Sequence, residues 1–256
     1  MKRLVKTILV LSVLVWHVFS GVLALPFLRD PWRRRRHFVA ATARHSRWVM
    51  RLLNIHMPVD ARINAKEKQN YLIVANHMSY LDAILVASFR PSAFVTSMEM
   101  KNSPGLGQIT DTGGCLYVER RSKENIHNEI GQIEEALKRG FDVVVFPEAT
   151  STDGSALRGF KRPLFAAAVK AGVPVLPVVI QYEYLDGAPV TKANRDALCW
   201  YGAMSFAGHF LGLMKYRRID MRLTVLPAIE IKTDSSRDTL MDAAFTAISG
   251  QYRPIV

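Results

Sequence analysis

The chain has 256 residues, 49% of them hydrophobic, and a formal net charge of +12 at pH 7. This length suits one catalytic domain with an appendage better than two domains. The charge suits an anionic partner, which leaves nucleic acid, a phosphate-bearing metabolite and an anionic membrane face open. Cys115 and Cys199 stand far apart, outside any CxxC or Cys/His spacing. This argues against a disulfide framework or a structural zinc site and favours a reducing compartment.

The N-terminal region contains a long apolar run, Ile8 to Leu28, interrupted only by small polar groups and His17. As a helix it would cross about 30 Å of hydrocarbon. A secretory signal peptide is the alternative, but the run exceeds the usual apolar core of about 7–15 residues and lacks a clear cleavage site. We therefore expect a retained membrane anchor.

A cluster of arginines follows the apolar run: Arg29, Arg33, Arg34, Arg35 and Arg36. These outnumber the basic residues before the run, so the positive-inside tendency predicts a catalytic domain on the cytoplasmic side, most simply of a bacterial inner membrane.

Between Phe38 and Ile55, apolar residues alternate with arginines and a histidine, which is typical of a basic amphipathic helix at a membrane interface. A helical hairpin dipping into one leaflet and a solvated basic linker are the alternatives. Each arginine near anionic lipid gains about 1 kcal/mol, which favours membrane over nucleic acid as the partner. We expect residues 1–58 to form the anchor and amphipathic helix and residues 59–256 the catalytic domain.

From Tyr71 onward, short apolar runs alternate with helical patterns. This predicts an α/β fold with a mixed, largely parallel sheet flanked by helices. The predicted strands are Tyr71–Ala75, Ala93–Ser97, Cys115–Glu119, Asp142–Phe146 and Met221–Leu226. The predicted helices begin near Leu81, span Ser122–Arg139, run from Pro163 to Gly172, and span Ser235–Ser249.

Two segments are harder to interpret. Pro174 and Pro177 argue that Val173–Ile180 is an irregular or edge strand, because proline cannot donate to a sheet ladder. The stretch from Gln181 to Asp220 has no clear pattern, and its aromatic residues fit either contact with an acyl chain or simple domain packing.

His77 and Asp82 are the first candidates for catalytic residues, because they lie at the junction between a predicted strand and a predicted helix. The carboxylate can fold back to the imidazole Nδ1 and leave Nε2 facing a cleft, as a general base requires. Ser79 suits a helix N-cap better than a nucleophile, because no G-x-S-x-G elbow surrounds it. No further spaced ligands accompany the pair, so we expect no metal. Taken alone, the pair is weak evidence, and a hydrogen-bonded structural histidine is the default reading.

Three further segments strengthen the case for a catalytic role of this pair: Gly114 to Arg120, Phe146 to Thr150, and Val173 to Pro177. Together with Asn76 to Asp82 they match, in order, the Asn-His-x-Ser-x-x-Asp, Gly-x-Ile-x-x-x-Arg, Phe-Pro-Glu-Gly-Thr and Val-Pro-x-x-Pro blocks. The chain thus resembles the glycerolipid acyltransferase family, which includes the 1-acylglycerol-3-phosphate and lysophospholipid acyltransferases. The resemblance spans roughly Tyr71 to Ile180.

The resemblance implies that His77 deprotonates an acceptor hydroxyl, which attacks the thioester of acyl-CoA or acyl carrier protein directly, while Asp82 orients the ring. It implies no covalent acyl-enzyme and no cofactor beyond the acyl donor. It also implies that Glu148, Ala149, Thr150 and Ser151 form the acceptor-binding block, and that Arg120 lies toward the acceptor's phosphate. Without the resemblance, Glu148 would be read equally well as a helix-cap acceptor and Arg120 as a surface ion pair.

The sequence departs from the family at two basic positions. Ser151 stands where lysophosphatidic acid acylators usually carry an arginine, and Ser97 where the family usually has a lysine. Each lost charge-assisted bond is worth about 1.5–3 kcal/mol. We therefore expect an acceptor with less exposed charge, such as a lysophospholipid diester or a lyso-aminolipid. Lysophosphatidic acid, a non-catalytic lipid-binding protein on the same fold and, from charge alone, a nucleic-acid-binding protein remain alternatives.

Overall fold

The computed structural model describes residues 3–61, 68–119 and 126–256. The longer helices are α1 (Arg3–Ala24), α2 (Pro31–Leu53), α3 (Tyr80–Phe89), α6 (Ile126–Lys138) and α9 (Arg237–Ser249). The shorter ones are α4 (Met98–Lys101), α5 (Leu106–Thr112), α7 (Phe165–Ala171), α8 (Phe206–Leu213) and the 3-10 helix η1 (Arg195–Ala197). The strands are β1 (Ile55–His56), β2 (Val59–Ala61), β3 (Leu72–Ala75), β4 (Ser92–Ser97), β5 (Leu116–Val118), β6 (Asp142–Val145), β7 (Val175–Leu185), β8 (Ala188–Pro189) and β9 (Ile219–Val225).

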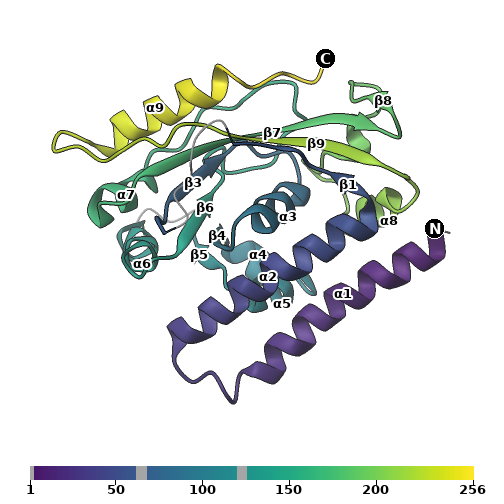
Figure 1. The fold of residues 1–256 in the computed structure, drawn as a ribbon, viewed down its shortest axis with the longest axis horizontal. Helices are drawn as coiled ribbons and strands as arrows, with labels where there is room; N and C mark the ends of the chain where they lie inside the picture. The colour runs from purple at the N-terminus through teal and green to yellow at the C-terminus, as the bar shows by residue number, and fades with distance from the viewer. Residues whose placement is uncertain (1–2, 62–67, 120–125) are drawn as a thin grey trace.

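The strands form one mixed sheet in the order β1-β9-β7-β3-β6-β4-β5, with β2 beside β9 and β8 beside β7 (Figure 1). Strands β7, β3, β6, β4 and β5 run parallel, while β9 pairs antiparallel with β7. This confirms the predicted mixed, largely parallel sheet flanked by helices.

The sheet is covered on both faces, as buried parallel strands require. Alternate residues of β3 show this: Ile73 and Ala75 pack toward α2, α3 and α8, whereas Leu72 and Val74 pack toward α6, α7 and α9. In Figure 1, α9 accordingly lies on one side of the sheet and α2 and α3 on the other. The near-continuous apolar runs in the sequence follow from this two-sided burial.

Strand β7 corrects the expectation of an irregular or edge strand at Val173–Ile180. It lies between β9 and β3, and its residues from Val175 to Ile180 are buried. The Pro177 carbonyl accepts from Leu226 N–H, so the residue opposite Pro177 lies just beyond the end of β9. The donor that proline lacks therefore falls where the ladder with β9 ends, and the rest of the strand pairs normally.

Helix α2 confirms the predicted amphipathic helix, but its apolar face packs on the protein and not on a membrane interface as predicted. Asp30 caps its start by accepting from Arg33 N–H at 2.6 Å, and Asn54 ends it in the left-handed conformation. Its apolar residues, including Phe38, Val49 and Leu53, are buried, and the helix packs on α3. The apolar face therefore contacts the domain rather than a lipid interface.

Helix α1 runs antiparallel beside α2 at the edge of the molecule (Figure 1). Among the described residues it is the helix long and apolar enough to cross a membrane, judged by length and composition. Its large exposed apolar side chains are Leu4, Val5, Ile8, Leu9, Leu11, Val15, Trp16, Phe19, Val22 and Leu23. Lys6, by contrast, points inward and donates to the carbonyls of Leu53 (3.3 Å) and Tyr216 (2.7 Å). Helix α1 therefore presents an apolar outer face and makes polar contacts with the rest of the protein on its inner side.

Candidate active site

A cavity of about 520 Å³ opens at the carboxyl ends of the parallel strands β3, β4 and β6. His77 follows β3, Ser97 ends β4, and Ala149, Thr150 and Ser151 follow β6; all five line the cavity. The carboxyl edge of a parallel sheet is where α/β proteins place their ligands, because loops from adjacent strands converge there. The cavity therefore gathers motif residues that are up to 74 positions apart in the chain (77 to 151).

The His77 and Asp82 side chains are in direct contact. His77 Nδ1 lies 2.9 Å from Asp82 Oδ2. The imidazole is 21% exposed, whereas the carboxylate is fully buried. Because a carboxylate only accepts, Nδ1 carries the proton, and Nε2 is the unprotonated nitrogen of the neutral ring. Within the described residues no hydrogen-bond partner occupies Nε2, so the ring offers a base to the cavity.

Asp82 is held by donors on both carboxylate oxygens. Oδ2 also accepts from the backbone N–H groups of Met78 (2.6 Å) and Ser79 (2.8 Å), while Oδ1 accepts from the Tyr182 hydroxyl at 2.6 Å. Four donors therefore satisfy this buried carboxylate and fix its orientation. Ser79 occupies the N-cap position of α3 as expected, although its hydroxyl oxygen has no hydrogen-bond partner within the described chain.

Tyr182 is a site residue that the sequence did not reveal. It is buried in β7, one hundred positions beyond Asp82, in the stretch that showed no clear sequence pattern. Among the described residues, its hydroxyl is the hydrogen-bond donor to Asp82 Oδ1. The sequence offered one indication of Tyr182. The predicted strand that contains Val173 to Pro177 could continue past Ile180, which would bring its next inward-facing residues to the site.

The backbone and the ring of His77 are also held by contacts with neighbouring residues. The His77 N–H donates to Glu148 Oε1 at 2.7 Å, and its carbonyl accepts from the N–H and hydroxyl of Thr152 at 3.0 and 3.1 Å. The ring stacks on Phe146, with centroids 4.1 Å apart and planes 14° apart. These contacts come from the loop after β6, so that loop sets the position of the base.

Glu148 is buried and faces backbone groups. Besides His77 N–H, it accepts Arg158 N–H on Oε2 at 2.9 Å. Burial raises the pKa of Glu148, and the two backbone donors partly oppose this rise. In the structure the carboxylate ties the loop after β6 to the end of β3.

The neighbouring motif residues differ in environment. Ala149 adopts a left-handed backbone with φ +61°, a conformation that glycine, the family's usual residue, adopts without a Cβ penalty. Thr150 is exposed. Ser97 and Ser151 both line the cavity, so the two positions where the family usually has a basic residue lie at one site. Arg120 lies outside the described residues.

An aromatic wall closes another side of the cavity. It consists of Tyr80 from α3 together with Trp200, Tyr201, Phe206 and Phe210 from the region between β8 and β9. Trp200 N–H donates to the Met78 carbonyl at 2.9 Å, which fixes this region beside His77. Part of the segment without a clear sequence pattern therefore forms the wall of the cavity.

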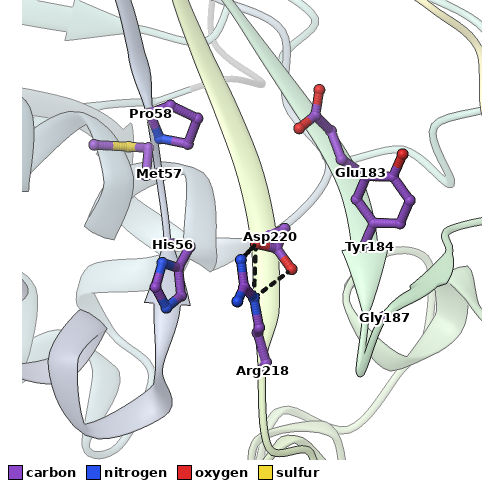
Figure 2. A pocket seen from close by; sticks show the side chains of 8 residues that line it. All are labelled: His56, Met57, Pro58, Glu183, Tyr184, Gly187, Arg218 and Asp220. Atoms are coloured by element: carbon purple, nitrogen blue, oxygen red, sulfur yellow. Dashed lines mark hydrogen bonds and ion pairs between the residues drawn. The ribbon is translucent and has the colours of Figure 1, made fainter.

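A second hollow, of about 720 Å³, lies at the sheet edge near β1, β7 and β9 (Figure 2). Its charged side chains pair with protein groups: Arg218 forms two-pronged contacts with Asp220, and Glu183 accepts from Arg222 at 2.6 Å. This hollow is more open than the cavity at His77, and among the described residues its histidine, His56, forms no hydrogen bond with a carboxylate. The cavity at His77 is therefore the candidate site.

Within the described residues, no group of three or more His, Cys, Asp or Glu side chains is arranged to hold a metal ion. Cys115 and Cys199 are free thiols, and burial raises the pKa of Cys115 to about 12. Burial also raises the pKa of Cys199, so both sulfurs are protonated thiols at neutral pH and neither is a thiolate nucleophile.

Comparison with known proteins finds similar sequences among acyltransferases. The acyltransferase family model matches residues 56–181. A lyso-ornithine lipid O-acyltransferase from Pseudomonas aeruginosa is 35% identical over 152 residues, which cover 59% of this chain and 58% of that protein. A 1-acyl-sn-glycerol-3-phosphate acyltransferase from Neisseria meningitidis is 35% identical over 136 residues, or 53% of each chain. The chain thus matches less than two thirds of the length of either relative.

A solved structure shares the whole fold. The crystal structure of the 1-acyl-sn-glycerophosphate acyltransferase from Thermotoga maritima superimposes with a TM-score of 0.67, covering 98% of this chain and 96% of that chain. Sequence identity is 22%, so this likeness bears on the fold.

Proposed function

We propose, because the acyltransferase family model matches residues 56–181, that this protein is an O-acyltransferase that moves a fatty acyl group from a thioester donor to the hydroxyl of a lysolipid. The observation that carries the proposal is the contact between His77 Nδ1 and Asp82 Oδ2 at 2.9 Å, which leaves Nε2 as the base in the cavity. Acyl-CoA and acyl carrier protein are the donors that fit this chemistry.

In the proposed reaction, His77 Nε2 takes the proton of the acceptor hydroxyl as its oxygen attacks the thioester carbonyl. Asp82 stabilises the imidazolium that forms. The tetrahedral intermediate then collapses, the carbon–sulfur bond breaks, and the thiolate takes the proton from Nε2. The products are an ester and a free thiol, and His77 returns to its starting form without an acyl-enzyme.

The acceptor is proposed to carry less negative charge than a phosphate monoester. Ser97 and Ser151 line the cavity, and no lysine or arginine does so within the described part of the chain. A doubly charged phosphate needs cations or several donors to replace its water. A lyso-aminolipid or a lysophospholipid diester meets this condition, and the lyso-ornithine lipid relatives are consistent with it.

We further propose that the protein works on the cytoplasmic face of a bacterial inner membrane. The exposed apolar face of α1 and the exposed arginines of α2, such as Arg44 and Arg51, suit a bilayer with anionic lipid. Protease treatment of spheroplasts and of inverted vesicles tests this side: the catalytic domain should be cut only in inverted vesicles.

The decisive experiment is an acyl-transfer assay with purified full-length protein, a panel of lysolipids and both donor types, read by lipid mass spectrometry. We expect transfer to a diester or aminolipid to exceed transfer to lysophosphatidic acid. The Ser151→Arg variant should raise relative use of lysophosphatidic acid by about tenfold, because one charge-assisted bond is worth about 1.5–3 kcal/mol. Preferred acylation of lysophosphatidic acid by the wild type would refute the acceptor proposal.

A further inference from the structure

The cavity that contains His77 has a polar region on helix α2. Thr42, His45, Ser46 and Val49 lie on one face of the helix, at i, i+3, i+4 and i+7, and all four line the cavity. His17 of α1 lines the same region. Thr42 donates to the Gly113 carbonyl at 3.4 Å, so His45 and Ser46 are the polar side chains of this helix face that can meet a ligand.

The two histidines are hydrogen-bonded in series. His17 Nδ1 lies 3.0 Å from His45 Nδ1, and His17 Nε2 lies 3.4 Å from the Ile109 carbonyl. A carbonyl only accepts, so His17 Nε2 carries the proton and His17 Nδ1 is an acceptor. His45 Nδ1 is then the donor of the pair, which leaves His45 Nε2 as an unprotonated acceptor.

This acceptor belongs to a buried side chain. His45 is 5% exposed, and within the described residues no hydrogen bond is made by its Nε2. Burial, with smaller contributions from His17 and Arg44, lowers the pKa of His45 to about 4, so the ring stays neutral at pH 7. A ligand with a matching donor would therefore find a hydrogen-bond acceptor on this wall of the cavity.

Resting on the acyltransferase function proposed above, we propose that His45 Nε2 accepts a hydrogen bond from a hydroxyl group on the fatty chain of one substrate. Ser46, next in the chain and on the same cavity wall, supplies a hydroxyl that can donate to the same oxygen. The site would thus select hydroxylated over plain chains, and the hydroxyl belongs either to the transferred acyl group or to the chain of the lysolipid acceptor.

The test measures kcat/KM for matched substrates with the full-length protein in detergent. In one arm, myristoyl-CoA is compared with its derivatives hydroxylated at the second, third or terminal carbon, using one plain acceptor. In the other arm, the donor is plain and the acceptor chain carries the hydroxyl. We expect about a tenfold preference for a hydroxylated substrate in one arm, as one neutral hydrogen bond gives, and that arm identifies the source of the hydroxyl.

The variants connect this preference to His45. His45→Leu should reduce the ratio to about one while the plain substrate is still used, and His45→Gln, which keeps an acceptor oxygen, should restore part of it. His37→Leu, the same change at an exposed histidine of α2, should keep the full preference. A wild type without preference in either arm, or an unchanged preference in His45→Leu, would overturn the inference.

A binding measurement separates this inference from the acyltransfer proposal. Myristic acid and its hydroxylated derivatives are titrated into the full-length protein and followed by isothermal calorimetry. Tighter binding of one hydroxylated acid, lost in His45→Leu, supports the His45 site even if no transfer is detected. Equal affinities for all the acids, together with absent transfer preference, would refute it.

Discussion

Replacement of Asp82 by Asn tests the charge at the centre of the site. The asparagine oxygen can keep the three donors now on Oδ2, namely His77 Nδ1, Met78 N–H and Ser79 N–H. Its amide group can then face the Tyr182 hydroxyl, which turns to accept. The fold and the His77 tautomer are therefore expected to survive, and the main loss is the negative charge beside the imidazolium.

The expected loss of activity follows from the geometry. With Nδ1 and Oδ2 2.9 Å apart, the charge centres are about 4 Å apart. At an effective dielectric constant of about 20, two unit charges at that separation attract by about 4 kcal/mol. Since 1.36 kcal/mol corresponds to a factor of ten, kcat should fall roughly a thousandfold, with little change in KM.

The assay is steady-state acyl transfer with saturating donor, accompanied by thermal unfolding of each variant. Asp242→Asn, the same change at an exposed residue of α9, is the matched control and should leave kcat unchanged. If Asp82→Asn retained kcat within tenfold of the wild type, the role of the carboxylate as the imidazolium's partner would be refuted.

Three further predictions concern stability and positioning. Ala149→Gly should raise the melting temperature by about 2 °C, because glycine relieves a left-handed backbone worth roughly 1 kcal/mol; a lower melting temperature would contradict this. Tyr182→Phe should lower the unfolding free energy by about 2 kcal/mol and kcat by about tenfold, since a buried bond to a charged group is lost; unchanged kcat would show that Tyr182 does not position Asp82. For His45, the pKa of 6.5 in the unfolded chain lies above the pKa of about 4 in the folded protein. As the pH falls from about 6.5 to about 4, the unfolded state therefore binds a proton that the folded state does not. The contribution of His45 to the stability of the fold is lost over that window. The urea midpoint of His45→Leu should therefore change less with pH over that window than the wild-type midpoint, and equal slopes would exclude this contribution.

The sequence predicted best those parts of the fold that depend on local pattern. The apolar runs at β3 and β6 became the central strands, and the end of α7 at Gly172, with φ +65°, matches the predicted helix end. Helix α6 ends at Lys138, close to the prediction, whereas the Ser122 cap lies outside the described residues. These features are decided by a few neighbouring residues.

The errors arose where distant residues decide the outcome. The central position of β7 depends on where β9 ends relative to Pro177, and the apolar face of α2 depends on the position of α3. In the same way, the pairing of Asp82 with Tyr182, and of His17 with His45, joins segments that no local pattern links. Motif order predicted the His77 and Asp82 contact because both residues lie on one strand–helix turn.

The most direct test of the central claim is acyl transfer by His77→Ala in the full-length protein with the best acceptor found for the wild type. The account predicts that transfer falls to background while thermal unfolding stays cooperative, because His77 Nε2, oriented by Asp82, is the base. Transfer at the wild-type rate by a folded His77→Ala protein would contradict the account.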